Sequence, residues 1–342
     1  MNRVLIVLPN WYGETLFATP FLRQLRGLCP EAFLATLGWP QCAEILQGNP
    51  HINRHVVFDE PGAHRSLAGR WALARALRAL GFDAAFILRR SLSRTLLLAA
   101  AGIPERVGFA NAKSGWLLTR RVAAPEAAGH KAASYLPLLR VVGAPGPLGT
   151  YDYVVTPEER EAATTLLRTQ GLLLDQPFAV VHPGANWDHK RWPPEQFAAL
   201  ADRLIKRHNL QVVITGGPGD AELARRLVEQ MTEAAALLVG QTTLRQLASC
   251  VEQARLVVAN DTGVLHVAAA LRRPVVALFG PTDPARTGPL GDSARTMVLH
   301  HPDCCPAIPC YAPDHPAHPG MSAISVDEAE AACRSLLEKT GD

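Results

Sequence analysis

Short apolar runs rich in β-branched residues alternate with longer amphipathic segments along most of the chain. The apolar runs predict strands at residues 3–8, 32–37, 55–58, 84–88, 178–182, 211–215, 256–258 and 275–279, with a shorter one at 237–238. Helical spacing predicts helices at residues 15–28, 41–46, 66–80, 91–101, 157–169, 221–231, 243–253, 264–271 and 326–339, and one that begins after Trp192. This alternation predicts an α/β fold with doubly wound parallel sheets, because strands buried on both faces are joined by helical crossovers.

The chain is long enough for two domains. A single hydrophobic core rarely grows beyond about 250–300 residues, and this chain has 342. The densest cluster of turn residues before mid-chain lies at 145–149, where we place the linker. We expect an N-terminal domain over residues 1–155, a second domain over 156–325, and a final segment over 326–342 that can pack back toward the first. Residues 113–122 are expected to be irregular and basic.

Charge is distributed unevenly along the chain. Residues 1–155 carry 17 Lys and Arg against 9 Asp and Glu, whereas the remainder carries 17 against 22. Most of the basic excess comes from Arg65, Arg70, Arg75, Arg78, Arg89, Arg90, Arg94, Arg120, Arg121 and Lys131. A basic first domain suits an acidic partner. We do not expect nucleic acid, because no nucleic-acid motif or aromatic interleaving accompanies these arginines.

The cysteines are typical of free thiols that pack in the core, since their number, seven, is odd and most are scattered through apolar segments. Cys304, Cys305 and Cys310 are exceptions, because they lie among His300, His301, His315 and His318. Their spacing matches no standard zinc pattern and prolines interrupt it, so we expect no metal. No apolar run approaches the roughly 18 residues of a membrane span, and the chain begins directly with a strand. We therefore expect a cytoplasmic protein without a transmembrane segment.

Residues 255–284 form the segment around which the second domain is organised. A buried strand runs into the turn Asp261-Thr262-Gly263, where a helix begins. Free N–H groups and the positive end of the helix dipole should then lie at the carboxyl edge of a parallel sheet, where such folds bind phosphate. The backbone at Thr262 and Gly263 can therefore receive a diphosphate. Asp261 repels phosphate, so we expect it to accept hydrogen bonds from sugar hydroxyls or to cap the helix.

Three further side chains complete the predicted donor site. Lys190, just before the helix start at Trp192-Pro193, can neutralise the negative charge that grows on a leaving nucleotide. His266 lies three residues after Gly263 on the same helical face, where it either reaches the donor or packs in the core. Glu222 follows the glycine turn at 216–219, and a contact to the nucleoside ribose is our hypothesis for it.

The first strand-to-helix turn carries a candidate general base. The sequence PNWYGE at residues 9–14 lacks the G-x-G-x-x-G fingerprint, which disfavours a dinucleotide-dependent oxidoreductase. Glu14 follows Gly13 at the start of a helix, a position from which a carboxylate can take the proton of an attacking hydroxyl. The alternative role for Glu14 is that of a favourable acid in the first helical turn.

Several strings resemble the bacterial lipopolysaccharide heptosyltransferases, glycosyltransferase family 9. They are NWYGETLFATP, GIPERVGF, HPGANWDHKRWP, the glycine turn at 216–219 and DTGVLHVAAALRRPVVALFGPTDP. This resemblance spans nearly the whole chain, and the Trp11 form of the first loop is more like heptosyltransferase II than heptosyltransferase I.

The resemblance implies a GT-B fold, in which two Rossmann-like domains face each other across a cleft, and an inverting transfer that needs no metal or other cofactor. It implies ADP-heptose as donor and, as acceptor, the phosphorylated lipid A-core of lipopolysaccharide at the inner face of the inner membrane. That acceptor would suit the basic first domain. The matching residues imply that Asn186 and Lys190 bind the donor, Lys190 through phosphate, and that the acid after Gly13 is the base.

One residue departs from the family pattern, which reads Trp-x-Gly-Asp in the first loop. Here the acid is Glu14, whose extra methylene shifts the carboxylate by about one carbon–carbon bond, and misplacement on that scale can cost orders of magnitude in rate. Two alternatives stay open. A nucleotide-sugar epimerase of the same architecture would share the phosphate turns, and a non-catalytic nucleotide-sugar binding protein would account for the altered acid.

Overall fold

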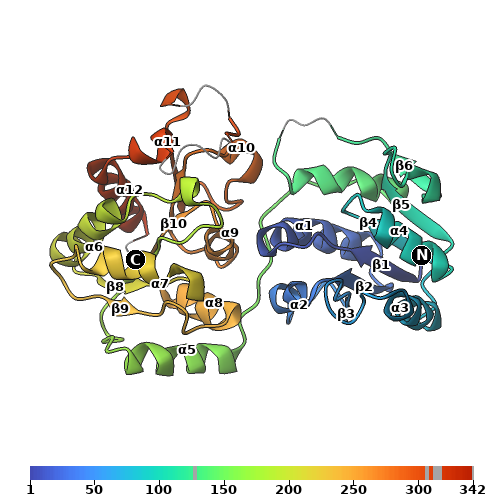
Figure 1. Ribbon diagram of the computed structural model, residues 1–342, viewed down its shortest axis with the longest axis horizontal. Coiled ribbons are helices and arrows are strands. Elements are labelled where there is room, and N and C mark those ends of the chain that lie inside the picture. Colours follow the sequence, from blue (N-terminus) through green and yellow to red (C-terminus); the bar gives the residue numbers. More distant parts are fainter. Residues whose placement is uncertain (126–128, 305–307, 311–317, 341–342) are drawn as a thin grey trace. The chain divides into compact units, whose positions relative to one another are not determined.

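The computed structural model describes residues 1–125, 129–304, 308–310 and 318–340, which belong to two compact units. The first unit is Met1–Val154 and the second is Val155–Asp342. Each contains a six-stranded parallel sheet with helices on both faces (Figure 1). The predicted α/β class with doubly wound sheets is therefore confirmed.

The sheet of the first unit has the order β3-β2-β1-β4-β5-β6. Its elements are β1 (Arg3–Val7), α1 (Tyr12–Leu28), β2 (Phe33–Gly38), α2 (Pro40–Leu46), β3 (Arg54–Val57), α3 (Leu67–Ala79), β4 (Ala84–Ile87), α4 (Leu92–Ala100), β5 (Glu105–Phe109), β6 (Arg120–Val122) and the 3₁₀ helices η1 (Gly115–Leu117) and η2 (Ala133–Val141). The sheet grows in one direction from β1 and in the other from β4. The loops after these two neighbouring strands therefore diverge, and doubly wound sheets bind ligands at such a switch point.

The second unit repeats this order as β12-β11-β10-β7-β8-β9, so that its switch point lies between β7 and β10. Its helices are α5 (Pro157–Thr169), α6 (Pro194–His208), α7 (Ala221–Val228), α8 (Leu244–Gln253), α9 (Gly263–Ala270), α10 (Pro284–Thr287), α11 (Pro319–Ser322) and α12 (Val326–Lys339). Its strands are β7 (Phe178–His182), β8 (Gln211–Ile214), β9 (Ala236–Leu237), β10 (Leu256–Asn260), β11 (Val275–Phe279) and β12 (Thr296–His300), and its 3₁₀ helices are η3 (Asp188–Lys190), η4 (Pro218–Asp220) and η5 (Pro302–Cys304).

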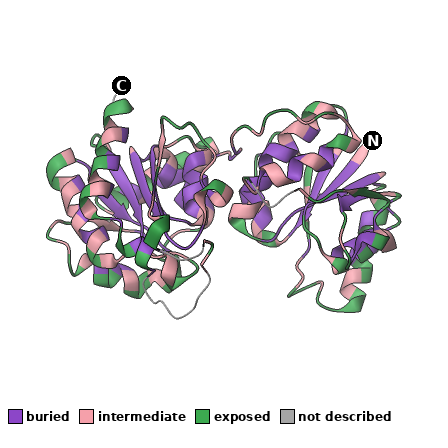
Figure 2. Ribbon diagram, turned by 90° about the horizontal axis from the view of Figure 1, so that it is seen from above, coloured by how far each residue is buried: buried purple, intermediate pink, exposed green. Residues whose placement is uncertain are grey.

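Successive residues of each strand face opposite helix layers. In the second unit, Val181 of β7 packs in the cluster formed with α6, α7 and α12, whereas its neighbour Val180 packs in the cluster formed with α5, α8 and α9. In the first unit, Leu5 and Val7 of β1 pack in the cluster formed with α3 and α4. Figure 2 shows the strands buried in both units, while the helices expose their outer sides. Burial on both faces explains why these strands read as continuous apolar runs.

Three strands were not predicted: β5, β6 and β12. Residues 113–122, expected to be irregular, contain η1 and β6, which pairs in parallel with β5. Arg120 and Arg121 give this edge strand no apolar pattern that would reveal it. Similarly, β12 is only partly buried at the other sheet's edge.

The segment between the sheets is anchored by α1. The Gln24 side chain donates to the carbonyl of Pro147, 2.8 Å away, and accepts from the N–H of Gly146 at 2.9 Å. The turn-rich residues 145–149 thus belong to the first unit, and the division between the units follows Val154. The final helix, α12, packs against α6 within the second unit.

Candidate active site

The switch point of the second sheet brings together residues far apart in sequence. Lys190 lies in η3, in the loop after β7, and Asp261 follows β10, the strand that pairs with β7. The Lys190 Nζ atom donates to Asp261 Oδ2 at 2.6 Å. The two side chains are 15% and 7% exposed, so this ion pair is largely shielded from water. Sequence reasoning predicted both residues for the site but did not predict that they bind each other.

Two further side chains contact the Asp261 carboxylate. Thr282 Oγ1, after β11, donates to Asp261 Oδ2 at 2.7 Å. His266 Nε2 lies 3.9 Å from the other oxygen, Oδ1, and its side chain is buried in α9. Both hydrogen bonds to this carboxylate end on Oδ2, whereas the 3.9 Å contact of Oδ1 is too long for a hydrogen bond.

The loops that carry this pair are fixed by buried hydrogen bonds. Asn260, the last residue of β10, donates from Nδ2 to the carbonyl of Pro183 at 2.8 Å and accepts from the N–H of Trp192 at 3.2 Å. The buried Trp192 ring donates in turn to the carbonyl of Ile324 at 2.9 Å. Lys190 is further held over the ring of Trp187, 4.9 Å from its centroid. The ammonium group is thus positioned before any ligand binds.

The N-terminus of α9 offers unused polar groups beside the ion pair. Thr262 is the N-cap residue, with an extended backbone and no capping bond from its own side chain. Its Oγ1 atom is buried without a hydrogen-bond partner among the described residues. Buried hydroxyls are nearly always paired, so a polar ligand atom is expected here. Of the two roles expected for Asp261, helix capping is wrong, because the N-cap residue is Thr262 and the Asp261 carboxylate binds Lys190 and Thr282. Acceptance of hydrogen bonds from sugar hydroxyls stays a prediction.

A second carboxylate, Asp220, closes the loop after β8. Its Oδ2 atom accepts from the N–H of Gly217 at 2.9 Å, and its Oδ1 atom lies 3.3 Å from Arg191 Nη2. The space around it is tight, since a Cβ on Gly184 would lie 2.5 Å from Asp220 Oδ2. Asp220 and Arg191 therefore tie the β8 loop to the loop that holds Lys190. Neither residue was predicted for the site, although Arg191 follows Lys190 and Asp220 follows the glycine turn at 216–219.

His182 ends β7 close to this network. Its Nδ1 atom lies 3.0 Å from Thr215 Oγ1 at the end of β8. Burial lowers the pKa of His182 to about 4, although the nearby charge of Asp220 opposes the shift. The side chain is therefore neutral near pH 7 and adds no positive charge to the site.

Two predicted donor residues lie outside the Asp261 cluster. Asn186 is exposed in the loop between β7 and η3. Glu222 is 68% exposed in the first turn of α7, where it pairs with Arg225 at 2.6 Å, and this hydrogen bond lowers the Glu222 pKa. Lys190, Asp261, Thr262, Gly263 and His266 are thus brought together, whereas the ribose contact of Glu222 stays a prediction.

Glu14 lies at the switch point of the first sheet, in the first turn of α1. Its side chain is 30% exposed, and its Oε1 atom is 3.8 Å from Nζ of Lys131. Burial and, secondarily, the negative charge of Glu14 raise the pKa of Tyr135. A carboxylate that is accessible and loosely paired can accept a proton from a ligand.

The loop before Glu14 is held by a buried arginine that was not predicted for the site. Arg94 of α4 is 1% exposed and donates to the carbonyl of Leu8 at 2.5 Å and to the Asn10 side chain. It also lies 3.6 Å from Glu60 and over the ring of Phe58. Arg94 thereby fixes the chain between β1 and α1.

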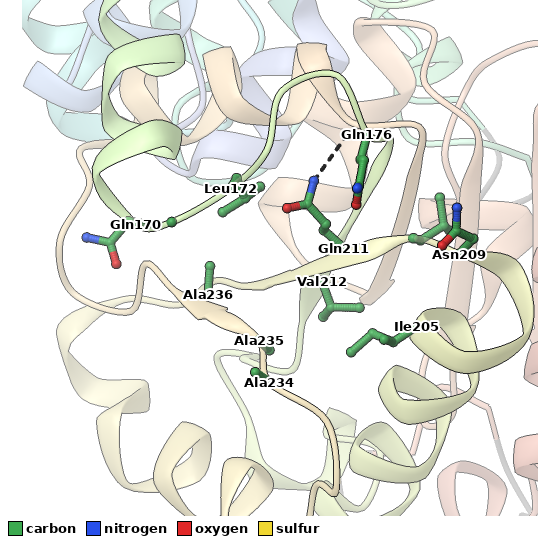
Figure 3. Close-up of a pocket in the computed structure, with 12 residues that line it drawn as sticks. Gln170, Leu172, Gln176, Ile205, Asn209, Gln211, Val212, Ala234, Ala235 and Ala236 are labelled. Carbon is green, nitrogen blue, oxygen red and sulfur yellow. Dashed lines mark hydrogen bonds between the residues drawn. The ribbon is translucent and has the colours of Figure 1, made fainter.

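A cavity of about 290 Å³ lies at the opposite, amino-terminal edge of the second sheet. Figure 3 shows Gln211 and Val212 at the start of β8 beside Ala236 of β9, with Asn209 and Gln176 nearby. No charged side chain lines this cavity. It therefore offers no cation for a diphosphate, and the Asp261 cluster is the better candidate site.

The described residues contain no group of three His, Cys, Asp or Glu side chains that could hold a metal ion. Cys304 and Cys310 are free thiols, while Cys305 and His315 lie outside the described residues. Within the same described part of the chain, no helix is long and apolar enough to span a bilayer.

The comparisons with known proteins agree with this geometry. A sequence profile for glycosyltransferase family 9 (heptosyltransferase) matches residues 70–311. The chain belongs to this family. The lipopolysaccharide heptosyltransferase 2 of Escherichia coli K12 is 30% identical over 310 residues, which cover 87% of this chain and 88% of that relative. The lipooligosaccharide heptosyltransferase 2 of Haemophilus influenzae is 28% identical over 307 residues, covering 86% and 88%.

Solved structures extend the family match to the whole fold. The E. coli ADP-heptose lipopolysaccharide heptosyltransferase II aligns over 100% of both chains with a TM-score of 0.84 and 26% identity. A family 9 glycosyltransferase from Veillonella parvula aligns over 99% and 98% with a TM-score of 0.87 and 26% identity. These findings confirm the predicted family, the GT-B fold and the glycosyltransferase class. A Listeria monocytogenes structure assigned as a UDP-N-acetylglucosamine 2-epimerase is more distant, at 12% identity and a TM-score of 0.53, and shares only the fold.

Proposed function

We propose that this chain transfers heptose from ADP-heptose to the phosphorylated inner core of lipopolysaccharide. Relatives that match nearly its full length are lipopolysaccharide and lipooligosaccharide heptosyltransferases. The observation that carries the proposal is the shielded Lys190–Asp261 pair, with Thr282, at the switch point of the second sheet. Such a site combines one fixed cation with hydrogen-bond acceptors, which suits a ligand that has both phosphates and sugar hydroxyls.

In this proposal the donor diphosphate lies at the N-terminus of α9. Backbone N–H groups of Thr262 and Gly263 and the buried Thr262 hydroxyl donate to phosphate oxygens. Lys190 bridges Asp261 and the diphosphate, so that its charge is available as the leaving group becomes more negative. Asp261 keeps the ammonium in place and accepts from a sugar hydroxyl.

The transfer itself requires a base on the acceptor side. The acceptor hydroxyl oxygen forms a bond to the anomeric carbon, the bond from that carbon to the diphosphate oxygen breaks with its electron pair, and the configuration inverts. Glu14 takes the proton that the hydroxyl loses. The proposed roles of the units follow, with the acceptor on the basic first unit and the donor on the second. The reaction is placed in the cytoplasm, at the inner face of the inner membrane.

A matched pair of lysine variants tests the donor site. Lys190→Ala removes the ammonium at the switch point, whereas Lys206→Ala removes an exposed lysine paired with Glu233 on the surface of the same unit. Only Lys190→Ala is expected to slow heptose transfer from ADP-heptose to a core acceptor. Equal transfer rates in both variants would refute the assignment of Lys190 to the donor site.

Two other outcomes would favour the alternative functions. Release of an epimerised donor in the absence of acceptor would favour an epimerase. Donor binding without turnover would favour a non-catalytic protein.

A further inference from the structure

The first unit exposes large apolar side chains on the outside of one helix layer. The inner sides of α3 and α4 and the residue after η1 pack in one core cluster, through Leu73, Leu97 and Leu118. On the outer side, the exposed fractions are 84% for Leu67, 56% for Trp71, 42% for Leu92, 44% for Leu96 and 66% for Trp116. We call these five side chains the α3–α4 face. Single exposed apolar residues are ordinary, but a set of this size on one layer marks an interaction surface.

The two helices lie side by side and run in the same direction (Figure 1). Arg78, near the end of α3, donates to the carbonyl of Ala100 at the end of α4 at 3.0 Å. At the other end, Ser93 of α4 donates to Glu60, in the loop before α3, at 3.2 Å. Both helices therefore begin at the carboxyl edge of the first sheet. The exposed residues of their first turns lie toward that edge, the same edge at which β1 runs into the Glu14 loop.

The two helices of this face carry only basic charged residues, although Asp59 and Glu60 lie in the loop before α3. Residues 61–104 contain a single acid, Asp83, whose carboxylate accepts from the backbone N–H of Asn2 at 2.6 Å. The same segment contains Arg65, Arg70, Arg75, Arg78, Arg89, Arg90 and Arg94, and all except Arg70 and the buried Arg94 are exposed. On α3, Leu67, Trp71 and Arg75 are four residues apart and share one outer stripe.

A surface helix of the second unit provides the contrast. The outer side of α5 carries Glu158, Arg160 and Glu161 and no exposed large apolar residue. An ordinary solvated helix in this chain thus mixes both charges, whereas α3 combines Trp and Leu with arginine alone. The α3 combination is typical of helices that lie at a membrane interface, where arginines reach phosphates and Trp rings enter the headgroup layer.

We propose that the α3–α4 face docks this protein on the surface of an anionic lipid bilayer, with Leu67 and Trp71 entering the headgroup region. A second copy of the chain is a poorer occupant, because a two-fold contact would place this arginine-rich surface against itself. A bilayer offers both an apolar layer and a dense array of negative phosphates. The inference goes beyond the proposed reaction, since docking requires lipid but neither donor nor acceptor.

Sedimentation with lipid vesicles that contain no lipopolysaccharide tests the docking directly. The wild-type chain is expected to bind phosphatidylglycerol-containing vesicles, to release them as salt rises, and to bind pure phosphatidylcholine vesicles far less. The double variant Leu67→Ser/Trp71→Ser is expected to bind at least about tenfold more weakly, because two apolar anchors are lost. Arg75→Gln is expected to bind about fivefold more weakly, the effect of one arginine at an anionic surface.

Matched controls come from the second unit. Leu173→Ser changes another exposed leucine, 55% exposed, and Arg168→Gln changes an exposed arginine of α5. Both are expected to bind vesicles as the wild type does. Wild-type binding by Leu67→Ser/Trp71→Ser, or equal binding to neutral and anionic vesicles, would overturn the proposal. Self-association that this double variant abolishes, without any vesicle binding, would assign the face to a second copy instead.

A readout with a soluble acceptor separates this inference from the proposed function. The double variant is expected to keep wild-type transfer to a deacylated, soluble core acceptor and to lose transfer to an acceptor embedded in vesicles. Loss with the soluble acceptor as well would show that the face serves catalysis or folding, and would count against docking. A wild-type chain that binds anionic vesicles but transfers no heptose would refute the reaction and retain the docking face.

Discussion

The two units share one strand order, yet their switch points are built differently. In the second unit, Lys190 and Asp261 form a pair that is 15% and 7% exposed, and Thr282 donates to the same carboxylate. In the first unit, the Glu14 side chain is 30% exposed and stands 3.8 Å from Lys131, which is 43% exposed. One switch point is thus a closed network of charges, and the other presents an open carboxylate.

This difference indicates how a transferase divides its tasks. A diphosphate needs fixed donors and a fixed cation, because electrostatic stabilisation is strongest when the protein groups need not reorganise during reaction. A general base must stay reachable for the incoming hydroxyl. In the proposed mechanism the second unit supplies the fixed groups, and Glu14, which is 30% exposed and 3.8 Å from Lys131, supplies the reachable carboxylate.

The largest expected effect comes from Glu14→Gln, which keeps the shape of the side chain and removes its proton-accepting charge. Turnover should fall by roughly 10² to 10⁴, the usual contribution of a general base, while the affinity for donor stays unchanged. Steady-state transfer kinetics measure the first quantity and calorimetry the second. Glu31→Gln, on an exposed loop of the same unit, is the control. Full activity in Glu14→Gln would reduce Glu14 to a helix-terminus acid.

Glu14→Asp sharpens the same test, because it restores the family's acid but shortens the reach by one methylene. Arg94 holds the preceding loop through Leu8 and Asn10, so the loop cannot move freely to compensate. We expect a lower turnover number with unchanged donor affinity. A rate equal to or above that of the wild type would show that the loop is still matched to aspartate.

The next effect concerns the stability of the second unit. Lys190→Met leaves the Asp261 carboxylate shielded without its cation, which should cost roughly 3–5 kcal/mol of unfolding free energy. The double variant Lys190→Met/Asp261→Asn should recover part of that loss, because no uncompensated charge remains. Denaturant unfolding of the single and double variants measures this. Equal stability of Lys190→Met and the wild type would mean that the pair is solvated rather than structural.

Histidines give both units a similar sensitivity to acid. Burial lowers the pKa of His55 in the first unit and of His182 in the second to about 4, from an ordinary value of 6.5. As pH falls, each histidine takes up a proton near pH 6.5 in the unfolded chain but only near pH 4 in the folded chain. Each therefore contributes stability above pH 6.5 that is lost as pH falls toward 4, roughly 3 kcal/mol at most. His182→Gln and His55→Gln should each flatten the decline of unfolding free energy between pH 7 and pH 4. An unchanged slope in both variants would contradict neutral burial.

The smallest effect is expected from Thr282→Val, which removes one hydrogen bond to Asp261 and keeps the side-chain volume. A single buried hydrogen bond to a charged group contributes about 1.5–3 kcal/mol, and Lys190 still compensates the carboxylate, so we expect the lower end of that range. Unfolding free energy and donor affinity measure it, with Thr169→Val, on exposed α5, as the control. A donor affinity equal to that of the wild type would place Thr282 outside the functional network.

Many strand and helix positions could be predicted from the local sequence pattern. The contacts between residues distant in sequence could not. The expected strands at 178–182 and 275–279 coincide with β7 and β11, because fully buried strands are continuously apolar. Lys190 and Asp261 were each found from their own strings, but they are 71 residues apart, and their contact depends on β7 lying beside β10. Strand order is a property of the whole sheet and cannot be predicted from a short segment of sequence. For the same reason the role of Arg94 was not predicted, since it was counted only among the basic residues of the first domain, whereas its side chain is buried and holds the chain after β1.

The division of tasks between the units is tested most directly by donor binding, measured calorimetrically with ADP-heptose for Lys190→Ala and Glu14→Gln side by side. We predict that Lys190→Ala weakens donor affinity by at least about tenfold, the loss of one charge-assisted phosphate contact, and that Glu14→Gln binds donor as the wild type does. Wild-type affinity in Lys190→Ala, or a comparable loss in Glu14→Gln, would contradict the assignment of the donor to the closed network of the second unit.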